Sequence, residues 1–118
     1  METETAALTR ELEGVAALYT SELAVVEVGR AVRRIGGDEE GYEQAERVLD
    51  ACVHVEVDDE IKRNAARSET ALATLDVIHL ESARSIRTLL DAFVTYDLRL
   101  AAAARAAGFT AISPGRDS

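Results

Sequence analysis

Three carboxylates stand apart from the other acidic residues of this chain because of their positions in its apolar patterns. Glu27 has Leu23 and Ala31 four residues away on either side, so apolar neighbours flank it on one face of a helix. Asp76 interrupts an apolar stripe, and Asp97 directly follows an apolar run. Carboxylates that cluster raise one another's pKa unless a divalent cation neutralises them. Such a cluster would suit a metal-dependent enzyme.

The position of Asp97 follows from the C-terminal part of the chain. Residues 92–96 form an apolar run that suits a buried strand. Residues 98–107 predict an alanine-rich helix that Gly108 can end, and residues 109–113 form a second apolar run. Strand, helix and strand with short connections predict a βαβ unit with parallel strands. Asp97 then lies at the carboxyl end of a strand, where open α/β sheets bind their ligands.

The rest of the chain predicts further alternation of helices and strands. Helices are expected at residues 3–13, 22–35, 39–51, 59–67 and 70–86. Strands are expected at residues 15–20 and 53–57. Ser21, Asp38 and Asp58 are expected to cap the helices that follow them. This order is typical of a parallel sheet covered by helices on both faces.

Length and composition indicate one soluble globular domain that spans residues 1–118. Hydrophobic residues make up 47% of the chain and charged residues 30%, which excludes a disordered protein. No apolar stretch is long enough to cross a membrane, and the N-terminus is acidic where a signal peptide is basic. The single cysteine, Cys52, has no partner for an internal disulfide, so we expect a cytoplasmic protein.

The net charge of −9 argues against a simple nucleic-acid binder, because 22 acidic residues face only 13 basic ones. It leaves open a metal-dependent enzyme whose carboxylates are neutralised by cations, or a protein with a basic partner. The sequence contains no glycine-rich phosphate loop, no paired cysteine or histidine ligand motif and no GxSxG.

Each of the three carboxylates also has an interpretation without chemistry. Glu27 is equally explained as a surface residue that pairs with Arg30. Asp76 can be a first-turn acid that the helix dipole favours, and Asp97 can be simply the N-cap of the next helix. His79 is spaced to bond Asp76, although a packed helix histidine explains it as well. Only the three acids taken together favour a common site.

Three segments of the chain closely resemble the VapC family of PIN-domain toxins. They are TSELAVVEVGRAVRR at 20–34, TLDVIHLESA at 74–83 and DAFVTYDLRLAAAARAAGFTAISPG at 91–115. The matching family patterns are Ser-x-Leu-x-x-x-Glu, Leu-Asp-x-Ile-His-Leu, and Val-Thr-Tyr-Asp followed by Arg-Leu and a Pro-Gly close. Order and spacing agree with the family over nearly the whole chain.

The resemblance implies a three-layer α/β/α sandwich with acidic residues around Mg²⁺ or Mn²⁺. It places Glu27, Asp76 and Asp97 at three of the family's four acidic positions, and Thr95 at a hydroxyl position near the same pocket. It also implies an endoribonuclease toxin restrained by an antitoxin, with a metal-activated water as the nucleophile. A cation that bridges the carboxylates to phosphate reconciles RNA with the negative charge.

One departure from the family concerns its first strand, of the type Tyr-x-Asp-Thr-Ser-Ala. That strand supplies the centre of the sheet and the fourth acid, and nothing like it precedes Thr3. It would lie between the strands expected at 15–20 and 92–96, which are left without a neighbour on that side. We therefore expect residues 1–118 to bind Mg²⁺ weakly, to cleave RNA poorly and to associate through the open sheet.

Other functions stay open beside the nuclease. One is a catalytically lapsed PIN-like module that dimerises or titrates an antitoxin. A receiver-like signalling domain is disfavoured, because its acidic pair should end the first strand whereas Asp58 and Asp59 end a later one. Apolar helix faces at 3–12 and 22–35 exceed what one small sheet can cover, which predicts a homodimer or an antitoxin-bound form.

Overall fold

Helices alternate with short strands along the chain in a computed structural model that describes residues 3–116. The helices are α1 (Glu4–Leu12), α2 (Ala24–Arg34), α3 (Glu39–Asp50), α4 (Asp59–Ala66), α5 (Thr74–Ser85) and α6 (Leu98–Ala106), with a 3₁₀ helix η1 (Arg87–Leu89). The strands are β1 (Tyr19–Ser21), β2 (Val53–Val55), β3 (Phe93–Val94) and β4 (Ala111–Ile112). The order of elements agrees with the sequence prediction.

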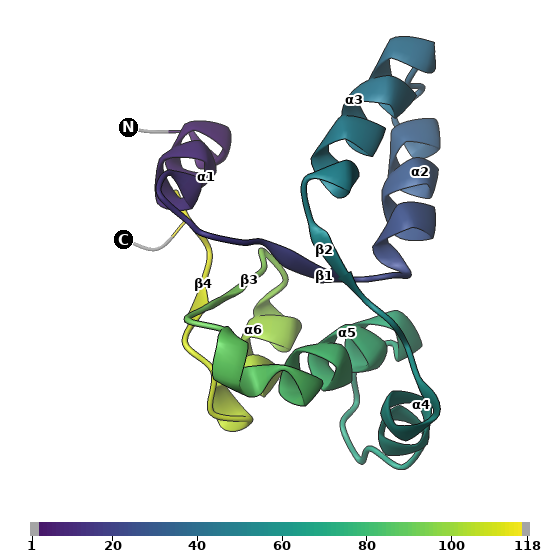
Figure 1. The fold of residues 1–118 in the computed structure, drawn as a ribbon, viewed down its shortest axis with the longest axis vertical. Coiled ribbons are helices and arrows are strands. Elements are labelled where there is room, and N and C mark those ends of the chain that lie inside the picture. The colour runs from purple at the N-terminus through teal and green to yellow at the C-terminus, as the bar shows by residue number, and fades with distance from the viewer. Residues whose placement is uncertain (1–2, 117–118) are drawn as a thin grey trace.

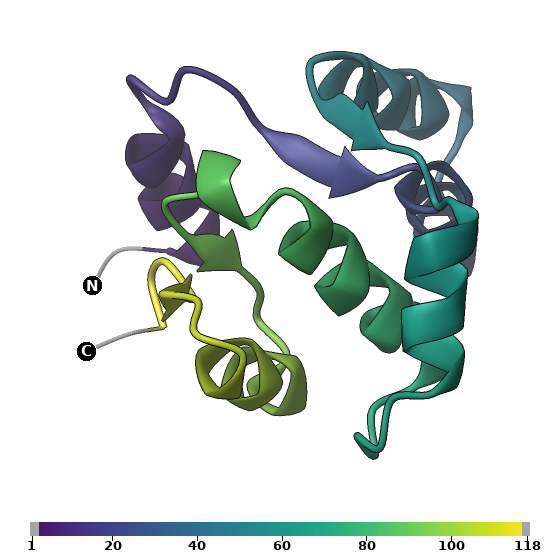
Figure 2. The same ribbon diagram turned by 60° about the horizontal axis from the view of Figure 1, so that its bottom comes forward.

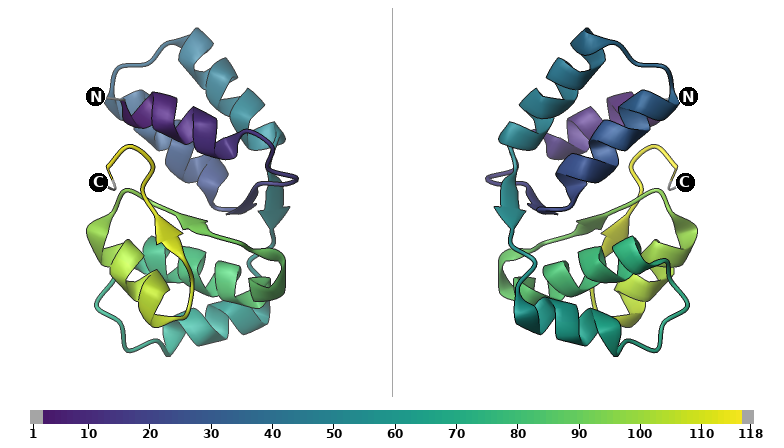
Figure 3. Two further views of the ribbon diagram at one scale, coloured as in Figure 1. Left: turned by 90° about the vertical axis from the view of Figure 1, so that its left-hand side faces the viewer. Right: turned by 90° about the vertical axis from the view of Figure 1, so that its right-hand side faces the viewer.

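The elements form three layers (Figures 1 and 3). Helices α1, α2 and α3 lie on one side of the strands, and α4, α5 and α6 lie on the other. No helix among residues 3–116 combines the length and apolarity that crossing a membrane requires. The predicted α/β class with a three-layer arrangement is confirmed.

The strands form two separate parallel pairs instead of one continuous sheet. β1 pairs with β2, with Tyr19 opposite Val53, and β3 pairs with β4, with Phe93 opposite Ala111. Within residues 3–116, no hydrogen-bonded ladder joins β1 to β3. Helix α5 makes the connection between the two pairs, because it contacts both β1 and α6 (Figure 2).

The main core lies on the C-terminal side of the molecule. Its buried members are Leu80, Ala83, Leu100, Ala101, Ala104, Phe109 and Ala111. Ala104 is completely buried, and the small alanine side chains of α6 let its backbone approach α5 and the β3–β4 pair closely. Gly108 then ends this helical segment at φ +96°, a conformation that glycine adopts at low cost.

The predicted caps of α3 and α4 are confirmed, and that of α2 is wrong. The Asp38 carboxylate accepts from the Gly41 N–H at 3.1 Å, and Asp58 accepts from the Ile61 N–H at 2.9 Å. Ser21 belongs to β1, and its hydroxyl accepts from the Leu23 N–H at 3.1 Å in a turn. This turn delays α2 until Ala24, so Ser21 cannot cap it.

Two further boundaries differ from the prediction for local reasons. The strand expected at 15–20 is shortened to β1 by a turn in which the Val15 N–H donates to the Leu12 carbonyl at 3.2 Å. The helix expected at 70–86 begins only at Thr74. The Thr70 hydroxyl accepts from the Leu72 N–H at 3.4 Å, so a side chain competes there with the helical hydrogen bonds.

Candidate acidic site

Asp97 lies where β3 turns into α6. Its carboxylate accepts from the Leu100 N–H at 2.9 Å, so it is the N-cap of α6. The capping interpretation is therefore correct, but it does not exclude a second role. One N-cap bond uses only part of the acceptor capacity of a carboxylate, which has about four lone-pair sites. Asp97 can cap the helix and still bind a cation.

Thr95 fixes the backbone just before Asp97. Its hydroxyl oxygen accepts from the Asp97 N–H at 3.1 Å, and its own N–H donates to the Ile112 carbonyl at 3.1 Å. The Ser113 hydroxyl donates to the Thr95 carbonyl at 2.5 Å. These bonds tie the end of β3 to β4, so Thr95 positions the residue that the resemblance assigns to the metal pocket.

Asp76 lies in the first turn of α5 and is half-buried. Burial raises the pKa of its carboxyl, and the negative charge of Asp97 raises it further. The charge of His79 lowers this pKa, and that of Glu27 raises it. Three carboxylates from three helical segments therefore share one electrostatic environment centred on Asp76.

Glu27 reaches this environment from the opposite layer of helices. Its Oε1 atom lies within hydrogen-bond distance of His79 Nε2, which joins α2 to α5. The Glu27 side chain is 37% exposed and the His79 side chain 19%. Sequence reasoning missed this pair. Both residues lie in segments that resemble the family, but only the packing of α2 over α5 brings together residues 52 positions apart.

The donor set fits a hard divalent cation. Carboxylate oxygens are the ligands that Mg²⁺ prefers, and a cation would relieve the burial and repulsion that raise the pKa of Asp76. Among residues 3–116, however, no three Asp, Glu, His or Cys side chains come together closely enough to hold an ion. The sharing of one ion by Glu27, Asp76 and Asp97 thus stays a prediction for the ion-bound protein.

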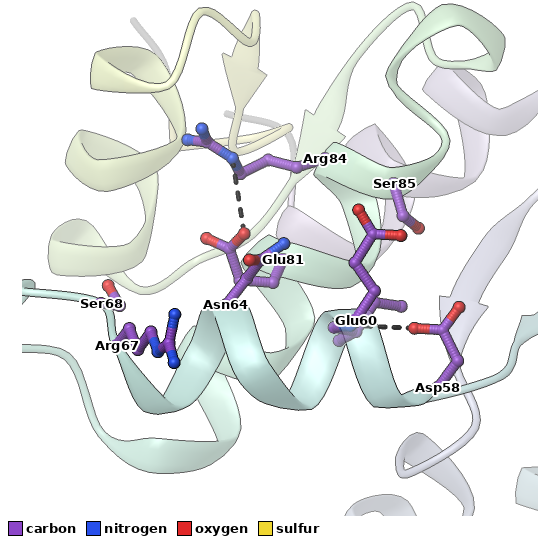
Figure 4. Close-up of a pocket in the computed structure, with 9 residues that line it drawn as sticks. Asp58, Glu60, Asn64, Arg67, Ser68, Glu81, Arg84 and Ser85 are labelled. Carbon is purple, nitrogen blue, oxygen red and sulfur yellow. Dashed lines mark hydrogen bonds and ion pairs between the residues drawn. The ribbon is translucent and has the colours of Figure 1, made fainter.

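A cavity of about 600 Å³ lies elsewhere, between α4 and the second half of α5 (Figure 4). Its lining residues are Asp58, Glu60, Ile61, Asn64, Arg67, Ser68, Glu81, Arg84 and Ser85. Asp58 is occupied in capping α4, and Glu81 pairs with Arg84 at 3.5 Å. None of the three candidate carboxylates lines this cavity.

The second histidine, His54, and the single cysteine, Cys52, have ordinary structural partners. His54 Nε2 lies 2.7 Å from the Leu49 carbonyl oxygen. The Cys52 thiol donates to the Val48 carbonyl at 3.4 Å, and burial raises its pKa. A thiol with a raised pKa stays protonated at neutral pH and is a poor nucleophile. The structure thus favours the interpretation that neither residue is catalytic.

Comparison with known proteins identifies the family of this chain. The PIN domain family matches residues 1–106. Ribonuclease VapC35 of Mycobacterium tuberculosis is 38% identical over 100 residues, which cover 82% of this chain and 73% of the relative. Ribonuclease VapC47 of the same species is 39% identical over 97 residues, which cover 81% of this chain and 71% of the relative. No solved structure matches significantly. This chain therefore belongs to the PIN-domain family and, within it, to the VapC group.

Proposed function

We propose that this chain is an endoribonuclease toxin of VapC type that depends on Mg²⁺ or Mn²⁺. The observation that carries the proposal is the electrostatic coupling of Asp97, Glu27 and Asp76 in a chain of this family. The relatives are named ribonucleases, which supports RNA as the substrate. Glu27, Asp76 and Asp97 would hold the cation, which when bound supplies Lewis acidity and an activated water.

The chain's own residues contribute position and charge. Asp97 is held by its bond to the Leu100 N–H and by the bond from its own N–H to Thr95. Asp76 is held by the start of α5, which packs against β1. When these carboxylates are ionised, they repel an RNA phosphate, so productive binding of RNA requires positive charge between the carboxylates and the phosphate.

The proposed partners are an antitoxin and a second copy of this chain. Support comes from α2, where Val25 and Val26 are half-exposed or more and Ile35, just beyond the helix, is 84% exposed. Exposed apolar side chains grouped on α2 and at its C-terminal end are typical of an interaction surface. The lone cysteine, Cys52, supports a reducing compartment, so we propose the cytoplasm as the site of action.

The deciding experiment is RNA cleavage by the purified chain with Mg²⁺ or Mn²⁺, compared with Asp76→Ala, Asp97→Ala and Asp97→Asn. Asparagine caps a helix about as well as aspartate, so Asp97→Asn removes the charge while keeping α6. We expect the Asp97→Asn variant to lose at least roughly 100-fold in cleavage, taking effects on outer-shell groups as a lower guide.

Asp58→Asn is the matched control, because Asp58 caps α4 in the same way but lies outside the acidic site. It should cleave RNA like the unchanged chain. The outcome that favours the second function, a lapsed module that only binds its antitoxin, is antitoxin binding without metal-dependent cleavage. The separation of the strands into two pairs is the observation that keeps this second function open.

A further inference from the structure

We propose that His79 is a positioning residue that holds the Glu27 carboxylate beside Asp76 for cation binding, an inference that rests on the proposed function. The two side chains meet through His79 Nε2 and Glu27 Oε1. His79 follows Asp76 by three positions on α5, so the two residues lie on the same helix face. A carboxylate held by His79 is therefore held next to Asp76.

The chemistry of the pair assigns the direction of the hydrogen bond. An ionised carboxylate only accepts hydrogen bonds, so His79 donates from Nε2 whenever Glu27 is charged. One Glu27 oxygen accepts this bond, and the carboxylate keeps further lone pairs for a cation. Histidine thus acts on the carboxylate and need not touch the ion.

The difference in burial indicates that His79 is held in place by packing, whereas the Glu27 side chain depends on His79 for its orientation. His79 belongs to α5, which also contacts β1 and α6, and its side chain is 19% exposed. Glu27 is 37% exposed on α2, and its long side chain loses considerable rotamer freedom when it is held in one place. A preformed bond to His79 reduces the ordering that remains when a cation binds.

Two other roles for His79 make different predictions. A purely structural histidine would change the stability of the fold but not cation affinity. A direct metal ligand would favour ions that prefer nitrogen, such as Zn²⁺ or Ni²⁺, over the hard ions that suit carboxylates. Cation affinity measured in variants separates these roles from positioning.

The test is Mn²⁺ binding to the full chain, followed by the loss of the free-ion electron paramagnetic resonance signal. We expect His79→Ala to weaken Mn²⁺ binding about 10–100-fold, the usual effect of removing a group that orients a ligand. His79→Gln keeps an N–H donor and should bind Mn²⁺ more tightly than His79→Ala. His54→Ala is the matched control, because His54 contacts a backbone carbonyl, and it should bind Mn²⁺ normally.

A double-mutant cycle tests whether His79 acts through Glu27. In the Glu27→Ala background, His79→Ala should cause no further loss of Mn²⁺ affinity, because the side chain that it orients is gone. Thermal melts without metal identify any variant that fails to fold, in which case His79→Gln alone supplies the comparison. Independent, additive losses would overturn the proposal.

RNA cleavage by the unchanged chain is measured separately, so the two proposals can fail separately. Mn²⁺ binding that depends on His79 without any cleavage would contradict the ribonuclease and support the positioning role. Cleavage and Mn²⁺ binding that are both unaffected in His79→Ala would contradict the positioning role and leave the ribonuclease in place. An unchanged chain that does not bind Mn²⁺ would overturn the positioning role as well.

Discussion

The β3–β4 pair lies against the main core with α6, whereas β1 and β2 are joined by the helical hairpin α2–α3, which carries exposed valines. On the first side, Leu100 and Ala104 are almost fully buried. On the second side, Val25 and Val48 are at least half-exposed on α2 and α3. The two pairs have the same parallel topology, so the difference lies in what covers them.

This difference divides the acidic site. Asp97 comes from the well-packed side, and Glu27 comes from the exposed hairpin. Asp76 and His79 lie on α5, which contacts elements of both sides. The geometry of the site therefore depends on how firmly α5 couples the two sides.

The largest effect on stability is expected from truncating a buried core side chain on the better-packed side. Leu100→Ala should lower the free energy of unfolding by about 2–5 kcal/mol, through lost burial and the cavity that remains. Val25→Ala, on the exposed hairpin, should change it by no more than about 0.5 kcal/mol. Urea denaturation of both variants measures the contrast. Equal losses would show that α2 packs as tightly as α6 in solution.

The second prediction concerns a strand that would connect the β1–β2 pair to the β3–β4 pair. Within residues 3–116 no hydrogen-bonded ladder joins β1 to β3, so a strand that carries an aspartate, added at the N-terminus, should pair between them and supply a further acid. We expect Mn²⁺ affinity to rise by about 10–100-fold and RNA cleavage to rise with it. The same strand with asparagine in place of the aspartate is the control, and it should reduce self-association in light scattering without restoring cleavage. Strong cleavage by residues 1–118 alone would show that three acids suffice.

A smaller effect is expected from neutralising Asp76 without metal. Because folding raises the pKa of Asp76, its carboxyl resists ionisation in the folded state. This cost to stability is absent below the ordinary pKa of 3.8, grows as the pH rises from 3.8 to the raised pKa, and is constant above it. Asp76→Asn should therefore raise the melting temperature at pH 7 in a chelating buffer, and the gain should vanish in acid. A gain that persists at low pH would mean that the charge is not its cause.

The smallest effect is expected at Thr95. Thr95→Val removes the acceptor of the Asp97 N–H and should cost about 1 kcal/mol of stability, the usual net contribution of one hydrogen bond. RNA cleavage should fall because Asp97 is held less firmly. Thr95→Ser keeps the hydroxyl and should behave like the unchanged chain in melts and in cleavage assays. A Thr95→Val variant that cleaves normally would limit Thr95 to a role in the fold.

Short-range features of this protein could be predicted from its sequence. Asp38, Asp58 and Asp97 were each expected before a helix, and each accepts a hydrogen bond from the residue three positions later. The parallel pairing of β3 and β4 followed from the short helix between them. Ser21 was the exception, because its hydroxyl accepts a bond two residues away and forms a turn instead of a cap.

Local patterns in the sequence were enough to predict the order of helices and strands and the capping acids Asp38 and Asp58, because these features depend on neighbours within a few positions. Two other features depend on long-range packing: the strands form two pairs, and Glu27 meets His79 across 52 positions. Such contacts depend on which faces of α2 and α5 lie against each other. That choice minimises exposed apolar surface over the whole molecule, so no local pattern in the chain can determine it.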